Sequence, residues 1–227
     1  MIPSKAYIIR ISDPISQEYA ATCAQSCIDN NIPYEFFEGV EGKSNYVAWL
    51  ESGIKIRQGS MDHRKNCTGA DPAACCSVSH ALIWKRIYEN DECAIILEHD
   101  ALMLHPVNID LPDNRIVVLG YKLTHTHRYN HKQAGPPKII RDIHYHHGAH
   151  AYAITAKTAG LLLKELEERG GGGPIDNRFF LRERTTSIPL AIADPTPAIG
   201  WLRKSTIWKK ACSSTGEFID SFQRHLK

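Results

Sequence analysis

The chain lacks a surplus of charge of either sign. Its 27 Lys and Arg residues oppose 25 Asp and Glu residues, which leaves a formal net charge of +2 when the 12 histidines are neutral. Proteins that bind nucleic acid over a broad face usually carry a clear basic excess. The composition therefore gives no general footprint for nucleic acid, although a local basic groove remains open within a nearly neutral chain.

Long apolar runs are also missing. Segments such as "AIIL" and "GLLL" have the size of core elements, well below the roughly 20 apolar residues that span a bilayer. The opening stretch "MIPSKAYIIRISDP" is too poor in apolar residues for the hydrophobic part of a signal peptide. We therefore expect a cytoplasmic protein, bacterial or from a virus-infected host, and leave open peripheral binding at the inner membrane face.

The seven cysteines lack both a paired CxxC motif and a compact disulfide spacing. A zinc site built from His63, Cys67, Cys75 and Cys76 is conceivable, but such sites usually contain CxxC pairs. The pattern favours reduced thiols.

Strand and helix patterns alternate along the chain, and no repeat or linker divides it. Helices are expected after an Asp13 N-cap with Pro14 as the first helical residue, and after a Thr155 N-cap. Glycines 170–173 should end the second of these. We predict one α/β domain over residues 1–227 with a mostly parallel central sheet. The strand patterns cover 6–11, 34–40, 93–99, 115–121, 148–155 and 187–196, and the helix patterns cover 14–30, 73–90, 156–169, 175–184 and a C-terminal segment from Ser214.

One stretch, "IILEHDALML" at 95–104, places acidic residues inside an apolar run. A buried carboxylate costs several kcal/mol unless a positive group lies beside it. Strand alternation would put Glu98 and Asp100 on one side and His99 on the other. Because ligands of open α/β sheets gather at the carboxyl ends of strands, the pair predicts a site for a hard divalent cation. The alternative is that both acids merely begin a solvated loop.

Several motifs, in order, resemble glycosyltransferase family 25, the lipooligosaccharide-biosynthesis and collagen-galactosyltransferase-like family. "CCSVSHALIWKRI" followed by "CAIILEHDA" is similar to the family's Cys-x-x-Ser-His helix and its carboxylate triplet, with His99 in place of the middle acid. The first strand, "IIRISDP", departs from the family pattern that brackets the nucleotide. The remaining similarities are "FFEGVEGK" at 36–43, His150–Ala151–Tyr152, Pro174 with Asp176, and weakly "STI" at 205–207.

The resemblance implies a GT-A fold, with helices on both faces of the sheet, and transfer of a sugar from a nucleotide donor, usually a uridine diphosphate sugar. It implies Mn²⁺ or Mg²⁺ as cofactor, held by Asp100 with help from Glu98 and, as a further candidate ligand, His150. Ser79, His80, Glu98 and Arg10 are the candidates for binding the donor.

An inverting transfer needs a carboxylate that accepts the proton of the acceptor hydroxyl. Asp176 is the candidate, although capping of a short helix is an equally reasonable role for it. Asp142 and Asp194 are weaker alternatives.

Two other constellations point to different chemistry. Adjacent Ser79 and His80 invite a hydrolase interpretation, but neighbouring helix positions do not face each other and no G-x-S-x-G elbow is present. "DIHYHHGAH" contains His144, His146, His147 and His150. We expect His144 and His146 to share one strand face, which makes a four-histidine zinc site less favourable than structural roles.

Three functions therefore remain. The first is a metal-dependent hexosyltransferase, the second a catalytically inactive nucleotide-sugar-binding protein on the same scaffold, and the third a histidine-rich metal-storage or hydrolytic protein. The acceptor is left open among lipooligosaccharide, capsular glycan, protein hydroxyl groups and hydroxymethylated nucleobases. The polar loops expected at 53–72 and 124–137 should choose among them.

Overall fold

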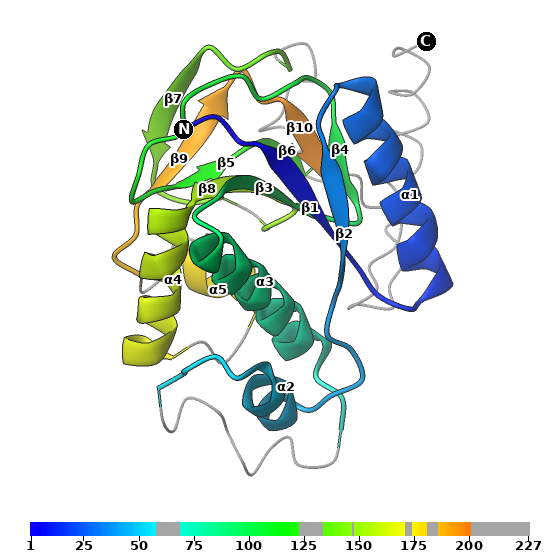
Figure 1. Cartoon of the computed structure of the whole chain (residues 1–227), viewed down its shortest axis with the longest axis vertical. Helices are drawn as coiled ribbons and strands as arrows, with labels where there is room; N and C mark the ends of the chain where they lie inside the picture. Colours follow the sequence, from blue (N-terminus) through cyan, green and yellow to red (C-terminus); the bar gives the residue numbers. More distant parts are fainter. Residues whose placement is uncertain (58–68, 123–133, 147, 171–173, 181–185, 201–227) are drawn as a thin grey trace.

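The computed structural model describes residues 1–57, 69–122, 134–146, 148–170, 174–180 and 186–200. Strands and helices alternate through these residues, with ten strands and five helices in the described ranges (Figure 1). In chain order they are β1 Lys5–Arg10, α1 Pro14–Asp29, β2 Tyr34–Glu38, α2 Asn45–Ser52, α3 Pro72–Glu89, β3 Cys93–Glu98, β4 Ala101–Met103, β5 Ile116–Val118, β6 Gly120–Lys122, β7 Ile139–Ile143, β8 Ala151–Thr155, α4 Ala156–Arg169, α5 Ile175–Phe179, β9 Leu190–Asp194 and β10 Ala198–Gly200.

A seven-stranded sheet with the order β2-β1-β3-β8-β5-β9-β7 forms the centre of the fold. β1 pairs in parallel with β2 and β3, β5 pairs in parallel with β9, and only β8 and β7 run against the other strands. The predicted mixed α/β class with a mostly parallel sheet is therefore confirmed. Because β3 lies between β1 and β8, its carboxyl end reaches the middle of one sheet edge.

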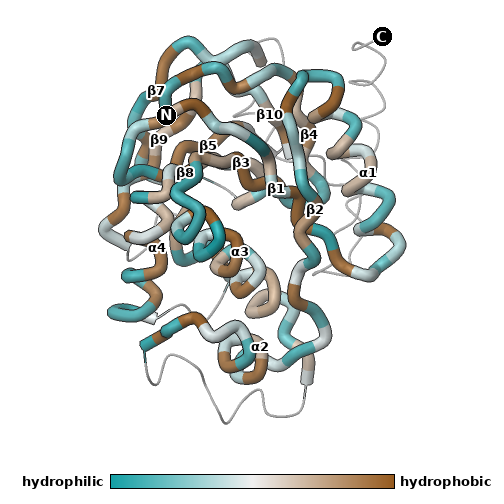
Figure 2. The backbone as a smooth tube through the Cα atoms, viewed as in Figure 1, coloured by the Kyte–Doolittle hydropathy of each residue, from teal (hydrophilic) through white to brown (hydrophobic). Residues whose placement is uncertain are grey.

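Helices cover both faces of this sheet. One core layer joins inward residues of β1 and β3, such as Ile8 and Leu97, to Cys23 and Cys27 of α1. The other joins Tyr7 and Ile96 to α3 and α4 (Figure 1). The hydropathy of the residues agrees with this two-layer core. Apolar residues follow the inner strands, and polar residues lie on the outward side of α1 (Figure 2).

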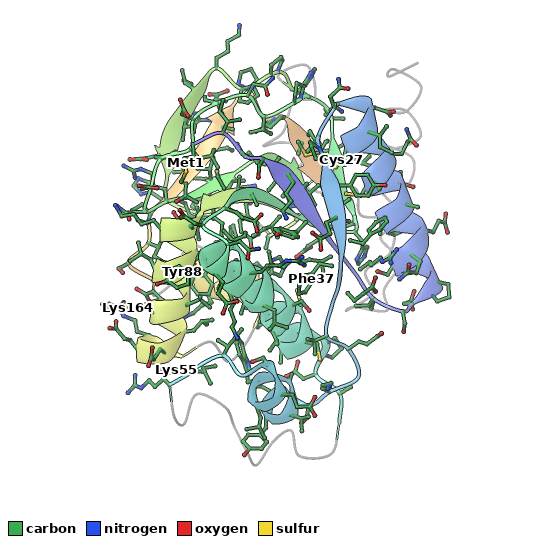
Figure 3. The ribbon with its side chains drawn as sticks, in the orientation of Figure 1. Met1, Cys27, Phe37, Lys55, Tyr88 and Lys164 are labelled. Carbon is green, nitrogen blue, oxygen red and sulfur yellow. The ribbon has the colours of Figure 1, made fainter. Side chains whose placement is uncertain are left out.

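A second sheet has three short strands in the order β4-β10-β6, and its strand β4 follows β3 directly in the chain. Glycine is required at position 120, because a Cβ there would lie 2.1 Å from the carbonyl oxygen of Ala198 in β10. A similar approach joins α3 to α4: a Cβ at Gly160 of α4 would lie 2.9 Å from the ring of Tyr88 of α3, and the Tyr88 label in Figure 3 accordingly lies beside α4.

Most sequence-based boundaries hold within a few residues, and some do not. The expected strand 115–121 is two strands, β5 and β6, which belong to different sheets. The expected strand 93–99 stops at Glu98, and 148–155 starts only at Ala151. The short elements α2, β4, β7 and β10 were not expected, because few residues give little periodicity. The C-terminal helix predicted from Ser214 lies outside the described residues.

The cysteines of the described ranges are free thiols, as expected. Burial raises the pKa of Cys93 to about 11. Within the same ranges, no helix has the length and apolar content to cross a bilayer.

Thr155 connects β8 to α4 and is the N-cap of α4, as the sequence predicted. Its buried hydroxyl accepts from the backbone N–H of Thr158 and donates to Asp113 Oδ1 at 2.9 Å. Thr155→Val keeps the shape but loses both bonds, so we expect the free energy of unfolding to fall by about 2 kcal/mol in urea titrations. Thr22→Val, where the hydroxyl only bonds the preceding helical turn, should stay within about 0.5 kcal/mol of the parent. Equal losses in both variants would contradict the cap.

Glu92 gives the fold an acid-sensitive contact. Burial acts to raise the pKa of its carboxyl, but hydrogen bonds from Asn90, Lys5 and Tyr7 outweigh burial and lower it. The ionised carboxylate therefore stabilises the fold above the ordinary carboxyl pKa, and this contribution disappears as the pH falls through the lowered value. We expect Glu92→Gln to unfold at a lower temperature than the parent at pH 7, and the two to converge only as the pH falls through the lowered pKa of Glu92. Exposed Glu89→Gln is the control; a constant gap across the range would refute the assignment.

Candidate active site

The carboxyl ends of β1 and β3 meet at one edge of the sheet. Ile9 of β1 pairs with Glu98 of β3, so Arg10 follows directly beside Glu98 along that edge. On the other side of β3, the backbone N–H of Glu98 donates to the carbonyl oxygen of His150 at 2.9 Å. The register therefore brings Arg10, Glu98 and the segment before β8 together at the end of the sheet where ligands of such folds bind.

Helix α3 presents two side chains to this edge. It begins at an Asp71 cap, whose carboxylate accepts from Ala73 and Ala74 N–H, with Pro72 in the first turn. Cys76 and His80 lie one turn apart on its inner side, and His80 Nε2 is 3.4 Å from Glu98 Oε1. Donor atoms of Cys76, His80 and Glu98 all lie within 4.8 Å of one another. They form the one such group of three or more Cys, His, Asp or Glu residues in the described part of the chain.

The opposite nitrogen of His80 is held by a buried hydrogen-bond network. His80 Nδ1 and the Tyr152 hydroxyl are 2.8 Å apart, and Trp84 Nε1–H donates to that hydroxyl at 2.8 Å. All three side chains are at most 1% exposed. Burial raises the pKa of Tyr152 well above its usual value, so the phenol is neutral at physiological pH. The network fixes the plane and position of the His80 ring.

Asp100 lies in the turn after β3 and is only 4% exposed. The alternation argument for Glu98 and Asp100 is wrong, because β3 ends at Glu98 and the backbone turns. Glu98 faces α3, whereas Asp100 lies near Cys23 of α1. The pKa of Cys23 is raised, mainly by burial, then by a hydrogen bond with Cys27, and further by the negative charge of Asp100. The His99 ring lies 6.0 Å from the Tyr19 ring of α1.

His150 is fully buried at the start of β8. Its ring packs on Gly200 of β10, where a Cβ would come within 2.9 Å, and lies 5.7 Å from the His146 ring. His150 therefore belongs to the same end of the sheet as Asp100, since Gly200 pairs with Ala101. The expected shared strand face of His144 and His146 is wrong, because β7 ends at Ile143. His147 lies outside the described residues.

Ser79 braces α3 rather than facing His80. Its hydroxyl donates to the Cys75 carbonyl oxygen and accepts from the backbone N–H of Val40, each at 2.8 Å. Both partners belong to the main chain, so the arrangement gives no support to a hydrolase. A direct contact between Ser79 and a donor remains a prediction.

Arg10 has an acidic partner. Its guanidinium contacts Glu38 Oε1 at 2.6 Å and lies 4.0 Å from the centre of the Phe36 ring. The predicted contact of Arg10 with the nucleotide would thus require the guanidinium to share or exchange this carboxylate.

The three candidate bases differ in their partners. Asp176, in the first turn of α5, accepts from the backbone N–H of Asn177 at 3.0 Å and makes no cap bond. Asp142 is paired with Arg115 at 3.0 Å and Asp194 with Arg141 at 2.9 Å. Both weaker alternatives therefore already have an arginine partner.

The Trp84–Tyr152–His80 network was not predicted. A signal for its helical half is present, because Cys76, His80 and Trp84 recur every four residues and so share one helix face. Nothing in the local sequence indicates that Tyr152 joins them, because it enters from β8, 68 positions beyond Trp84.

One comparison with known proteins, the match to a family profile, agrees with the motifs. Residues 4–113 match the profile of glycosyltransferase family 25 (LPS biosynthesis protein). A crystal structure of a glycosyltransferase involved in the glycosylation of the major capsid of PBCV-1 aligns over 95% of this chain and 99% of that one, with 11% identity and a TM-score of 0.37. No curated protein sequence matches. The matched range contains Arg10, Ser79, His80, Glu98 and Asp100 and ends before His150 and Asp176.

Proposed function

Since residues 4–113 match glycosyltransferase family 25, we propose that this glycosyltransferase moves a hexose from a uridine diphosphate sugar to a hydroxyl group, with inversion and with Mn²⁺ or Mg²⁺. The sheet, with helices on both faces, supports a GT-A-type arrangement in which the donor lies over the carboxyl ends of β1 and β3. The acceptor class proposed is a glycan, a lipooligosaccharide or another biopolymer.

The observation that carries this proposal is the burial of Asp100. Asp100 is only 4% exposed and directly follows a central parallel strand, and carboxylate oxygens are the ligands that hard divalent ions take. Asp100 lies two residues from Glu98, at the strand end where ligands of such sheets bind. A divalent ion and the donor diphosphate would bind at this strand end.

The donor set at this strand end fits Mn²⁺ or Mg²⁺. Such ions are usually held by one or two carboxylates, with substrate phosphates and water completing the shell, so a preformed cage is not required. Asp100 would hold the ion, and His150 is the nearby candidate for a further ligand. Glu98, which faces α3, would assist through a water or through the ribose of the donor. When bound, the ion would neutralise the charge on the departing diphosphate.

The protein groups have defined tasks in the transfer step. The acceptor oxygen forms a bond to the anomeric carbon while the bond from that carbon to the diphosphate oxygen breaks, and the electron pair leaves with the diphosphate. Asp176 takes the hydroxyl proton, which general-base catalysis requires. The proposal assigns this role to Asp176 because Asp142 and Asp194 are each paired with an arginine.

The segments predicted to select the acceptor, at 53–72 and 124–137, lie largely outside the described residues, which omit 58–68 and 123–133. The choice among lipooligosaccharide, capsular glycan, protein and nucleobase acceptors therefore remains a prediction for experiment.

A catalytically inactive nucleotide-sugar-binding protein is the second candidate. The pairing of Arg10 with Glu38 favours it, because a guanidinium already bound to a carboxylate contributes less charge to a diphosphate. Replacement of the middle acid by His99 points the same way.

One experiment separates the two. The purified chain is mixed with a panel of nucleotide sugars, with Mn²⁺ or Mg²⁺ or with neither, and both the melting temperature and donor cleavage are measured. The hexosyltransferase should show a larger thermal shift with ion and uridine diphosphate sugar together than with either alone, and should release the diphosphate. Strong binding without cleavage, across donors and acceptors, would favour the inactive protein. The anomeric configuration of the product, read by NMR, tests inversion.

A further inference from the structure

Helix α3 and strand β3 bring together a second, softer set of donor atoms. We propose that Cys76, His80 and Glu98 form a binding site for a borderline-soft divalent ion of the zinc class, which differs from the oxygen site proposed around Asp100 in its thiolate and imidazole ligands and has only Glu98 in common with it. The donor atoms of these three residues already lie within 4.8 Å of one another. Asp100 is not a member of this group.

The backbone holds the three donors from two directions. Cys76 and His80 are four residues apart on α3, so their side chains lie on the same face one turn apart. Glu98 approaches from the end of β3, with its carboxylate 3.4 Å from His80 Nε2. His80 is fully buried, whereas Cys76 and Glu98 are partly exposed and open the site to solvent.

The buried nitrogen of His80 points independently to a ligand. Within the described residues, Nε2 makes no hydrogen bond, although the ring is 0% exposed and Nε2 faces the Glu98 carboxylate. A buried polar atom of this kind costs free energy unless it finds a partner. A metal ion between the thiolate, the imidazole and the carboxylate would be that partner.

Tyr152 supplies the support that a histidine ligand needs. Ligating histidines almost always donate the other ring N–H to a neighbouring acceptor. The Tyr152 oxygen can accept hydrogen bonds; Trp84 Nε1–H donates to it, and His80 Nδ1 is 2.8 Å from the same oxygen. Metal binding would select the Nδ1–H tautomer, which leaves the Nε2 lone pair for the ion.

The chemistry of the three donors chooses the class of ion. Thiolate and imidazole favour zinc and its neighbours, whereas Mg²⁺ and Mn²⁺ prefer oxygen. Three protein ligands leave a fourth position open, as in catalytic zinc sites. Binding releases the Cys76 proton to solvent, since the thiolate is the ligand.

Cobalt(II) is the probe, because it takes zinc sites and its bond to a thiolate gives a charge-transfer band in the near ultraviolet. The untagged full chain is titrated with Co²⁺ alone, without nucleotide sugar. We expect the band to saturate at one ion per chain and to be abolished in Cys76→Ser. Glu98→Gln should weaken binding at least about tenfold, as losses around metal sites do.

Cys75→Ser is the matched control. Cys75 is the next residue of the same helix, its thiol donates to the Lys43 carbonyl oxygen, a bond that serine can also make, and it is outside the donor group. Its cobalt band should be unchanged. A band that persists in Cys76→Ser, or that falls equally in both serine variants, would overturn the site. Circular dichroism verifies the fold of each variant.

Two further variants sharpen the assignment. Tyr152→Phe removes the acceptor for His80 Nδ1–H, so the affinity for Co²⁺ should fall by about tenfold; an unchanged or tighter affinity would refute the tautomer and the proposed support. Asp100→Asn should keep the cobalt band, because Asp100 is outside the group. The cobalt band tests the Cys76 site, and the response to nucleotide sugar tests the proposed transferase function. Either measurement can therefore fail without the other.

Discussion

Asp100→Asn is expected to lower hexosyl transfer at least about 100-fold and to abolish the joint thermal shift with divalent ion and donor. Asparagine keeps the size of the side chain but loses the negative charge that would hold the ion. Metal ions contribute several kcal/mol to the stabilisation of charge in such transition states, and each 1.36 kcal/mol corresponds to a factor of ten in rate. Measured turnover and melting temperature at saturating donor test this directly.

The control for this variant is Asp110→Asn. Asp110 is 84% exposed and contacts only the N-terminal ammonium group among the ion pairs of the described residues, so its loss should leave transfer and the joint thermal shift unchanged. If Asp100→Asn retained full transfer with an intact response to the ion, the role assigned to Asp100 would be rejected, whatever the sequence motif implies.

Trp84→Ala is expected to reduce the free energy of unfolding by about 3–5 kcal/mol. The indole is 1% exposed, packs edge-on against Phe179 of α5 with ring centres 5.2 Å apart, and donates to the Tyr152 hydroxyl. The substitution leaves a large cavity between α3, α5 and the sheet and also removes a buried hydrogen bond. Urea unfolding followed by circular dichroism gives the value.

Two variants separate packing from hydrogen bonding at this position. Trp84→Phe fills most of the cavity but has no N–H, so a loss of about 1–2 kcal/mol is expected. Leu50→Ala on α2, where the side chain is 60% exposed, should stay within about 0.5 kcal/mol of the parent. A Trp84→Ala protein as stable as Leu50→Ala would show that this part of the core carries little of the stability.

Trp84→Phe should also affect the proposed site of Cys76, His80 and Glu98, because Trp84 contacts it through Tyr152 and His80. Without the indole N–H, the Tyr152 hydroxyl loses one of its two described partners, and the His80 ring is held less firmly beside Glu98. The cobalt band proposed for Cys76, His80 and Glu98 should therefore weaken in the folded fraction of Trp84→Phe as well.

Local patterns sufficed for much of the fold. The Asp13 cap with Pro14 started α1 as expected, Thr155 started α4, and Gly170 ended it, because capping depends on a few neighbouring residues. The apolar run before Glu98 is a buried central strand for the same local reason. The short strands β4, β7 and β10 escaped prediction because three to five residues show no clear period and their pairing partners are distant in sequence.

The sequence by itself determined that carboxylates stand at the end of a central strand, that Cys76 and His80 share a helix face, and that the motifs resemble family 25. Only the tertiary structure decided which neighbouring element each of these side chains faces. The turn after Glu98 sends Asp100 to the side of α1 while Glu98 meets α3, and Tyr152 reaches His80 from β8. Alternation and helical period describe one element at a time, whereas the direction of a turn and a contact between distant segments are set by packing of the whole sheet and its helices.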